Sequence, residues 1–310
     1  MKPVLVLSGP TATGKTATAV TLAQKLGLEV VNFDSLLFYR ELNIGTAKPT
    51  LAERADVPHH LIDVTGIADP MNAADFARLA KTVMTEIHSR GKVPLLVGGS
   101  GFYLQALLDG MWDSPTTPIA ISERSDALYA AQGIAPFLAE LEVHDRETFH
   151  RLHANDHYRI RRAVEHFWTH GTPFSAQRSA FTAKPPEAWR VFHAHLDFSK
   201  DEHLRIIQAR TRNMLATGLV AEVEDLLQRG FTGTEKPLQA IGYKETLDWL
   251  QGVFGTDALA FEERIVINTR RLAKAQRTWF KKKEKAVFDP RSEVNSLEER
   301  CREFLQAGGP

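Results

Sequence analysis

Eight residues near the start of the chain constrain its fold more than any other feature. Residues 9–16 read GPTATGKT and fit the pattern G-x-x-x-x-G-K-[ST]. They follow a leucine- and valine-rich run at 4–8 and precede residues 15–26, whose apolar positions have helical spacing. A glycine-rich loop between a strand and a helix directs backbone N–H groups at phosphate oxygens. The segment therefore predicts a phosphate-binding loop, and it does not distinguish a diphosphate from a triphosphate.

Each residue of this loop is a candidate ligand of the phosphate groups. The predicted set is Gly9, Pro10, Thr11, Ala12, Thr13, Gly14, Lys15 and Thr16. Lys15 adds a positive charge, and the amino terminus of the following helix adds its dipole. The hydroxyl of Thr16 can bind Mg²⁺, a hard cation that commonly accompanies substrate phosphates. We therefore predict Mg²⁺ as the cofactor, with Thr16 as its protein ligand.

Strand and helix signals alternate over the first hundred residues. Strands are predicted at 29–33, 60–64 and 93–97, and a helix with one apolar face is predicted at 75–88. Such alternation is typical of an α/β fold with a doubly wound parallel sheet, here built around the P-loop. Ligands of these folds bind at the carboxyl ends of the strands.

The pattern changes in the middle of the chain. Residues 112–189 contain six prolines, several helical segments and no clear strand, which indicates an inserted helical subdomain. Residues 190–198 read as a strand that returns to the sheet, and the rest of the chain is predicted to be helical. We therefore expect residues 1–111 to form the first part of the core. Residues 190–310 would complete it and add a helical carboxy-terminal part.

Composition narrows the class of protein further. Hydrophobic residues make up 43% of the chain and charged residues 25%, as in ordinary globular proteins. No window approaches the roughly 18 apolar residues that a membrane helix needs. The single Cys301 excludes an internal disulfide and a multi-cysteine metal site, and it suits a reducing compartment. We expect a cytoplasmic protein, monomeric by default.

Positive charge is concentrated near the carboxyl terminus, although 38 basic residues balance 38 acidic ones overall. Between 264 and 285 there are nine basic residues and only one acid, Glu284. Within a predicted helix from 261 to 285, Arg270, Lys274, Arg277 and Lys281 recur on one face. A local basic face on a neutral protein indicates a surface for a polyanion such as nucleic acid. An ordinary solvated face is the alternative.

Asp34 follows the second predicted strand, at the carboxyl edge of the sheet beside the phosphate loop. A carboxylate there could bind Mg²⁺, act as a general base or cap the next helix. The segment after it, 39–49, is polar, contains glycine and is poor at burying surface. Because such loops often carry function, this segment favours a functional role for Asp34.

Seven motifs, in order along the chain, resemble those of the tRNA dimethylallyltransferase (isopentenyl-tRNA transferase) family. They are GPTATGKT at 9–16; Asp34-Ser35 with Tyr39-Arg40 and IGTAKP at 44–49; PHHLID at 58–63; GGSGFY at 98–103; Asn155-Asp156 with Arg159, Arg162-Ala163 and Glu165; IGYKE at 241–245; and Thr269-Arg270 with Leu272-Ala273-Lys274, Gln276 and TWF at 278–280. Each motif alone is weak, but their shared order is specific. The zinc finger of the eukaryotic members is absent.

The resemblance implies a reaction and roles for three residues. The phosphate loop would hold dimethylallyl diphosphate, and the acceptor would be the N6 amine of adenosine 37, next to the anticodon of tRNA. Asp34 would be the general base that removes the N6 proton. Thr11 would contact the leaving phosphate oxygens, and Arg210 would bind the diphosphate.

The resemblance also implies a set of tRNA contacts around the anticodon stem-loop. They are Asp34, Ser35, Leu36, Leu37, Ser100, Gly101, Arg124, Tyr158, Arg159, Ile160, Arg161, Arg162, Gln239, Ala240, Ile241, Gly242, Tyr243, Lys244, Lys274, Arg277 and Lys281. Leu37 stands where many members have glutamine, and Ala275 stands where many have arginine. Phe102 and Tyr103 could stack on an extruded base, or they could be core aromatics.

Three alternative functions use the same features. A small-molecule kinase would need the phosphate loop and Asp34, but it gives no role to the basic helix. An adenylate isopentenyltransferase would prenylate free AMP rather than tRNA. A non-catalytic RNA-binding module would need no Asp34.

Overall fold

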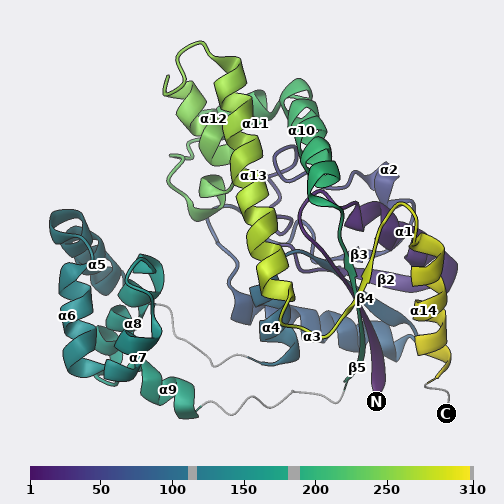
Figure 1. The fold of residues 1–310 in the computed structure, drawn as a ribbon, viewed down its shortest axis with the longest axis horizontal. Coiled ribbons are helices and arrows are strands. Elements are labelled where there is room, and N and C mark those ends of the chain that lie inside the picture. The colour runs from purple at the N-terminus through teal and green to yellow at the C-terminus, as the bar shows by residue number, and fades with distance from the viewer. Residues whose placement is uncertain (111–116, 181–188, 308–310) are drawn as a thin grey trace. The chain divides into compact units, whose positions relative to one another are not determined.

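The computed structural model describes residues 1–110, 117–180 and 189–307 (Figure 1). The chain divides into two compact units. The core unit comprises Met1–Leu108 and Pro185–Pro310, and the inserted unit comprises Asp109–Lys184. The predicted boundary between 111 and 112 lies outside the described residues. The other predicted boundary assigned Trp189 to the insertion, whereas Trp189 begins a strand of the core unit.

The core unit is built on one six-stranded sheet. Its strands are β1 (Lys2–Ser8), β2 (Leu28–Asn32), β3 (His59–His60), β4 (Val93–Gly98), β5 (Trp189–Leu196) and β6 (Ala286–Phe288). Their order is β3-β2-β4-β1-β5-β6, and all neighbouring strands are parallel. Ser8 lies opposite both Gly98 and His195. The loops after β1 and β4 therefore begin at the same edge of the sheet.

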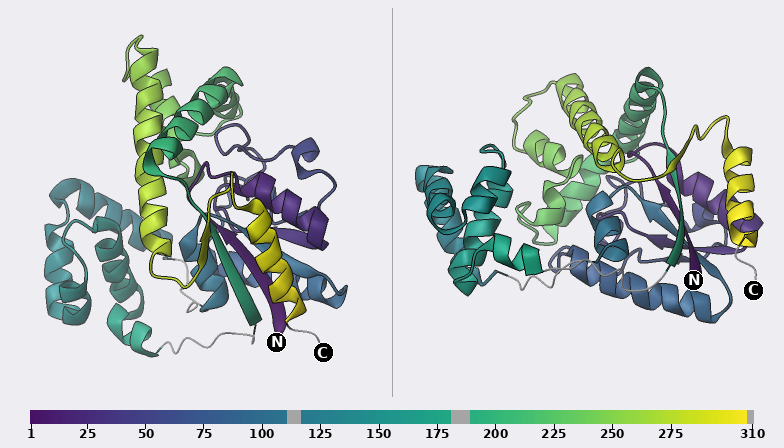
Figure 2. Two further views of the ribbon diagram at one scale, coloured as in Figure 1. Left: turned by 45° about the vertical axis from the view of Figure 1, so that its right-hand side comes forward. Right: turned by 60° about the horizontal axis from the view of Figure 1, so that its bottom comes forward.

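Helices cover both faces of this sheet, which confirms the predicted doubly wound fold. On one face, α1 (Lys15–Leu26) packs on β2 and β4, and α14 (Val294–Gln306) packs on β5 beside α1. Both views of Figure 2 place α14 next to α1. On the other face, α3 (Ala73–Ser89) contacts β2, β4 and α4 (Gly101–Leu108).

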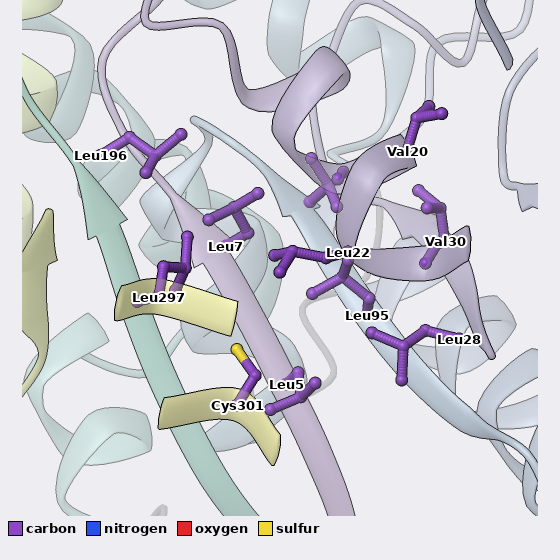
Figure 3. Packing of buried hydrophobic residues seen from close by; sticks show 14 of the residues in the cluster. Leu5, Leu7, Val20, Leu22, Leu28, Val30, Leu95, Leu196, Leu297 and Cys301 are labelled. Atoms are coloured by element: carbon purple, nitrogen blue, oxygen red, sulfur yellow. The ribbon is translucent and has the colours of Figure 1, made fainter. Parts of the chain in front are cut away.

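Alternation along β1 explains how one strand serves two helical layers. Leu5 and Leu7 point into the cluster that includes Leu22 of α1 and Leu297 of α14 (Figure 3). Val4 and Val6, which alternate with them, point to the other face and are also buried. A strand that is apolar on both faces suits the centre of a parallel sheet covered by helices.

Four further helices form a second hydrophobic core beside the sheet. They are α10 (Lys200–Ala216), α11 (Leu219–Gln228), α12 (Tyr243–Leu250) and α13 (Ala258–Phe280). A 3-10 helix, Lys236–Gln239, precedes α12, and the short α2 (Leu51–Arg54) lies in the segment after β2. The apolar side chains of these helices pack on Leu42 and Ile67, which anchor the long segment between β2 and α3.

The inserted unit is entirely helical over its described residues. It consists of α5 (Ile119–Gln132), α6 (Ala135–His144), α7 (Arg146–Arg151), α8 (His157–His170) and α9 (Phe174–Ala180). Its own core forms around Phe137 and Leu141 of α6 and around Ile160 and Val164 of α8.

Helix ends follow signals that are visible in the sequence. The side chains of Asn72, Asp156 and Asp257 cap α3, α8 and α13 by accepting backbone N–H bonds. Gly27 ends α1 with a φ of 66°, a left-handed conformation that glycine adopts without strain. The glycine signal accounts for the accurate prediction of the end of α1, whereas α3 begins at Ala73 rather than 75 and α13 at Ala258 rather than 261.

Three sequence predictions about the elements were wrong in part. The strand expected at 60–64 is only His59–His60, because Leu61 and Asp63 adopt positive φ values of 60° that interrupt an extended chain. The basic helix expected to reach 285 ends at Phe280, where Lys283 N–H turns back to the Phe280 carbonyl at 3.1 Å. The carboxy-terminal part was expected to be entirely helical, but it contains the short strand β6 before α14.

Candidate functional site

The phosphate loop connects β1 to α1 and is held in shape by contacts of its own. Ala12 and Gly14 have φ values of 64° and 76°, so the loop passes twice through the left-handed region. A Cβ on Gly9 would lie 2.6 Å from the Leu196 carbonyl oxygen, which makes glycine necessary there. The buried Thr13 donates its hydroxyl to the Pro10 carbonyl at 2.8 Å. The Thr13 hydroxyl therefore stabilises the loop itself.

Lys15 folds back over the loop. Its Nζ donates to the carbonyl oxygens of Gly9 at 3.0 Å and Pro10 at 2.7 Å. Burial lowers the pKa of Lys15 to about 8; the Asp34 carboxylate opposes this shift and the Arg210 guanidinium adds to it. A buried ammonium with few compensating charges favours the arrival of an anion. The loop is therefore electrostatically prepared for phosphate.

A single cleft brings the predicted catalytic residues together. The phosphate loop lines it with Asp34, Leu37 and Arg210. Other lining residues include Asn32 at the end of β2, Gly98 at the end of β4, and Thr46, Ala47 and Pro49. The cleft thus opens at the carboxyl edge of the parallel sheet, where ligands of such folds bind. Thr11, Asp34 and Arg210 meet there although Arg210 is far from the other two in sequence.

Asp34 is fixed by the residues on either side of it. Its N–H donates to Oδ1 of Asn32 at 2.8 Å, and its own Oδ1 accepts from the Leu36 N–H at 3.1 Å. Asn32 is in turn anchored through its Nδ2, which donates to the Leu61 carbonyl at 2.9 Å. Among the described residues, Oδ2 of Asp34 has no hydrogen-bond partner. The carboxylate therefore has one oxygen that orients it and one that is available to a ligand.

Arg210 comes from α10 and supplies a second positive charge to the cleft. One guanidinium nitrogen, Nη2, donates to the Thr46 carbonyl at 3.2 Å. Burial lowers the pKa of Arg210, and the Asp34 carboxylate opposes the shift. Lys15 and Arg210 therefore act on the same region as Asp34. Two cations and one carboxylate suit a ligand that carries more than one negative charge.

Gln276 of α13 joins the two glycine-containing loops of the site. Its Oε1 accepts from the Thr11 N–H at 2.8 Å, and its Nε2 donates to the Gly99 carbonyl at 3.1 Å. A Cβ on Gly99 would overlap the Gln276 amide. The sequence analysis gave Gln276 no role. No local signal could have supplied one, because its partners Thr11 and Gly99 are 265 and 177 residues away in the sequence.

The aromatic pair after β4 divides into one core residue and one surface residue. The ring of Tyr103 packs on Phe38 and Phe76 at centroid distances of 5.6 and 5.4 Å, and its hydroxyl donates to the Met71 carbonyl at 2.8 Å. Phe102 is 52% exposed and lies edge-on to Trp279. Tyr103 is therefore a core aromatic, and Phe102 alone is free to stack on a ligand.

The predicted RNA contacts around residues 34–37 and 100–101 lie close to one another. The hydroxyl of Ser100 accepts from the Ser35 N–H at 3.0 Å. Leu36 and Leu37 are half-buried, and Leu37 lines the cleft. Gly101 lies against Trp279, and a Cβ on Gly101 would overlap the indole. Of this group, Asp34 and Leu37 line the cleft, whereas Gly101 lines a separate hollow with Trp279.

The segment 239–244 is less accessible than a set of RNA contacts would be. Tyr243 is fully buried, and its hydroxyl donates to Glu222 at 2.6 Å. Gln239 donates to the Gly233 carbonyl, and Lys244 is paired with Asp248. Gly242 is buried, and Ala240 and Ile241 are half-buried. Of the predicted contacts in this segment, Gln239 is the most exposed.

The predicted basic face of α13 includes both exposed side chains and one that is half-buried. Lys274 is exposed on the helix, and Lys281 is exposed just beyond its end. Arg277 instead turns inward, where Nη2 lies 2.6 Å from Asp197 and the guanidinium side chain is only 25% exposed. The helical periodicity placed these residues on one face, but it could not show that an acid from another element lies beside Arg277.

In the inserted unit, most of the predicted arginines are occupied within the protein. Arg161 donates to Ser125 at 3.1 Å and lies over the Tyr129 ring, and Arg162 pairs with Glu165 at 3.0 Å. The guanidinium of Arg124 lies 4.0 Å from the centroid of the Trp168 ring, and Ile160 is fully buried. The predicted contacts that are exposed here are Arg124, Tyr158 and Arg159, and Arg159 also pairs with Asp156 at 3.4 Å.

The cleft offers a metal ion only part of a coordination shell. Among the described residues no group of three or more His, Cys, Asp or Glu side chains is arranged to hold a metal. The Thr16 hydroxyl and the Asp34 carboxylate do line the cleft beside the phosphate loop. Mg²⁺ typically takes one or two protein oxygens and completes its shell with water and substrate phosphates. These residues fit Mg²⁺ that is bound together with a phosphorylated substrate.

The loop, the parallel sheet and the charged cleft define a P-loop α/β protein whose site is built for a phosphorylated ligand. A family model described as IPP transferase matches residues 37–283. The tRNA dimethylallyltransferase 1 of Trichlorobacter lovleyi is 44% identical over 91% of this chain and 92% of its own length. The tRNA dimethylallyltransferase of Desulfosudis oleivorans is 39% identical over 98% of this chain and 96% of its own. The chain belongs to the IPP transferase family, as its motifs predicted.

Solved structures agree with this assignment. The full-length tRNA isopentenylpyrophosphate transferase from Bacillus halodurans aligns with a TM-score of 0.71 and 30% identity, covering 99% of this chain and 98% of that protein. A eukaryotic dimethylallyltransferase that acts on tRNA aligns with a TM-score of 0.82 and 26% identity, covering 99% of this chain and 80% of that protein. The fold is therefore shared along the whole chain.

Proposed function

We propose that this enzyme transfers a dimethylallyl group from dimethylallyl diphosphate to N6 of adenosine 37, next to the anticodon of tRNA, and releases diphosphate. Membership of the IPP transferase family supports this activity, as does the similarity to tRNA dimethylallyltransferases over most of the chain. One structural observation carries the chemical proposal. The only carboxylate that lines the described part of the cleft, Asp34, shares it with Lys15, Arg210 and the phosphate loop.

The first task of the site is to stabilise the leaving group. The C1–O bond of an allylic diphosphate breaks readily once the developing negative charge is neutralised. The N–H groups of the phosphate loop, Lys15 and Arg210 are preorganised positive ends that act where this charge appears. Thr11 lies on the same wall of the cleft. We assign it to the phosphate oxygens that leave.

The second task is to make the adenine amine a competent nucleophile. Its lone pair is delocalised into the ring, so attack on C1 requires that a proton be removed as the C–N bond forms. In the proposed step, N6 bonds to C1, the C1–O electron pair leaves with diphosphate, and the N6 proton passes to Asp34. The free Oδ2 of Asp34 suits this role, because Oδ1 is engaged with the Leu36 N–H.

Mg²⁺ is the cofactor that we propose for the donor site. The Thr16 hydroxyl would hold it together with oxygens of the bound diphosphate, and Asp34 is the carboxylate among the described residues that line the cleft. When bound, the ion would neutralise charge on the departing diphosphate. The protein groups described above perform the remaining steps.

We assign tRNA recognition to those predicted residues whose side chains are accessible. On the core unit these are Gln239, Lys274, Lys281 and the exposed Phe102. The Phe102 ring can stack on a base that has left the helical stack of the anticodon loop. On the inserted unit they are Arg124, Tyr158 and Arg159. Lysine and arginine contacts to phosphate position RNA without reading its sequence. Arg277, Tyr243 and Ile160 are given structural roles instead.

No helix within residues 1–110, 117–180 and 189–307 has both the length and the apolar character needed to cross a bilayer. A monomeric state and a cytoplasmic location, where unmodified tRNA is found, stay predictions.

A direct assay distinguishes this proposal from its alternatives. The protein is incubated with dimethylallyl diphosphate, Mg²⁺ and unmodified tRNA, and the RNA is digested and analysed by mass spectrometry. We expect the mass of one dimethylallyl group on the adenosine next to the anticodon. Parallel reactions replace tRNA with AMP or replace the donor with ATP. Efficient AMP prenylation, or ATP turnover without prenyl transfer, would contradict the proposal.

A further inference from the structure

Side chains from outside the phosphate loop form hydrogen bonds with both backbone groups of Thr11, its N–H and its carbonyl. Its N–H donates to Gln276, as described above, and its carbonyl lies 2.8 Å from Nε2 of His203 on α10. His203 is only 2% exposed. Its other ring nitrogen, Nδ1, lies 2.7 Å from Nη2 of Arg277, the residue that follows Gln276 on α13. Two consecutive residues of α13 therefore act on Thr11, one directly and one through His203.

The partners of His203 determine where its proton lies. A guanidinium can only donate hydrogen bonds, so Nδ1 of His203 must accept from Arg277. The ring is therefore neutral and carries its proton on Nε2, which donates to the Thr11 carbonyl. Arg277 is oriented in turn by Asp197, which accepts from Nε at 2.9 Å and from Nη2 at 2.6 Å. The result is a part-buried series of hydrogen bonds in which Arg277 donates to Asp197 and His203, and His203 donates to Thr11.

We infer that His203 is a positioning residue for the diphosphate-binding loop, fixed by Arg277 and Asp197 so that it holds the Thr11 carbonyl in place. This inference rests on the proposed function, because the loop is taken to bind the diphosphate of the prenyl donor. With its carbonyl and N–H both fixed, Thr11 presents its hydroxyl and the following N–H groups to the cleft in one geometry. Preorganised donors of this kind bind a leaving group without rearranging.

The same geometry predicts a particular sensitivity to acid. A proton added to Nδ1 of His203 would face the Arg277 guanidinium and break the bond between them. Burial is the largest cause of the lowered pKa of His203; Arg277 and Lys15 lower it further, whereas the Thr11 carbonyl and Asp197 oppose the shift. The Phe198 ring lies beside His203, with the ring centroids 6.2 Å apart. The network therefore persists at neutral pH and is lost as pH falls through this lowered pKa.

Two amide substitutions of His203 distinguish its hydrogen bond to Thr11 from its hydrogen bond to Arg277. In H203Q the terminal amide nitrogen can reach the place of Nε2 and donate to Thr11, whereas in H203N the amide reaches only the place of Nδ1. We expect H203N to raise the KM for dimethylallyl diphosphate by about tenfold, the effect of one buried hydrogen bond. We expect H203Q to retain most of the affinity, and tRNA affinity to stay unchanged in both.

His88 provides a matched control. Its Nε2 also lies against a backbone carbonyl, that of Pro3 at 2.9 Å, but at the start of β1 and away from the loop. H88N should therefore lower thermal stability without a change in this KM. If H203N fails to fold, R277K replaces it, because one ammonium cannot pair with Asp197 and also serve His203 in the guanidinium geometry. R277K should raise the KM severalfold.

Binding of inorganic pyrophosphate, measured by calorimetry, gives a readout independent of catalysis. It should weaken in H203N and R277K but not in H88N. The KM of the wild type should rise as pH falls through the pKa of His203, and H203Q should lack that rise. Folded H203N with wild-type KM and pyrophosphate affinity would overturn the inference. A wild-type protein that binds pyrophosphate but transfers no prenyl group would instead contradict the proposed function.

Discussion

Replacing the buried His195 and the half-buried His193 with amides that cannot titrate should make the core unit less sensitive to acid. His193 and His195 lie on β5, and the hydroxyl of Ser8 lies 2.7 Å from Nε2 of the first and 2.8 Å from Nδ1 of the second. Burial is the largest cause that lowers the pKa of each to about 4. Lys285 lowers both further, and Asp197 opposes the shift at His195.

The size of the effect follows from these two pKa values. Between pH 6.5 and pH 4 the unfolded chain binds protons at both histidines and the folded chain does not, so stability falls as pH falls. Once the pH is below the pKa of the histidines in the folded protein, no further stability is lost through them. At pH 5 it amounts to about 2 kcal/mol for each histidine, or about 4 kcal/mol for the pair. At pH 7.5 the contribution is close to zero, because the ring is neutral in both states.

The assay compares urea unfolding of the wild type and a double variant, H193Q with H195N, at pH 7.5 and pH 5. Glutamine can place an amide near the position of Nε2, and asparagine near that of Nδ1, so both can still bond to Ser8. The free energy of unfolding should drop between the two pH values by about 4 kcal/mol less in the variant than in the wild type. An equal drop in both proteins, or histidine pKa values near 6.5 by NMR, would refute the reasoning.

Two other substitutions test contacts that position the cleft. G101A should destabilise the core unit by roughly 1–3 kcal/mol, because the added Cβ overlaps the Trp279 indole; a thermal melt measures this, and combining it with W279L should restore part of the loss. E222Q should weaken the acceptor shared by the Tyr243 hydroxyl and the N–H groups of residues 43–45, at a cost of roughly 1–3 kcal/mol. Faster hydrogen exchange at 43–45 would accompany it, and unchanged exchange there would contradict this role.

The fold and the position of the phosphate site could be predicted because their signals are local. The loop, the preceding strand and the capping glycine Gly27 lie within thirty residues of one another, and each reports on its own backbone. Asp34 could be predicted for the same reason, since it ends a strand that neighbours the loop in sequence. The elements that were missed carry weak local signals. The strand β6 has three residues, and the third strand ends where Leu61 adopts a positive φ.

The residues that support the phosphate loop from behind, Gln276 and His203, could not be predicted, because they are distant from Thr11 in sequence. Gln276 and Thr11 are 265 residues apart, and His203 and Thr11 are 192 apart. Periodicity placed Arg277 on a basic face of a helix, but the acid that turns it inward comes from the end of β5. Tyr243 belongs to a motif that resembled an RNA contact, yet its ring is enclosed by the second core. Only the packed structure separates exposed motif residues from buried ones.

The measurement that tests the central claim most directly is the transfer rate of D34N with the donor already bound. Asparagine keeps the size of the side chain and an oxygen for the Leu36 N–H, but it cannot accept a proton from N6. We predict that kcat falls by about 10²–10⁴, while the KM for dimethylallyl diphosphate and the affinity for tRNA change by less than about threefold. A variant that prenylates tRNA at the wild-type rate would contradict the assignment of Asp34 as the base beside the phosphate loop.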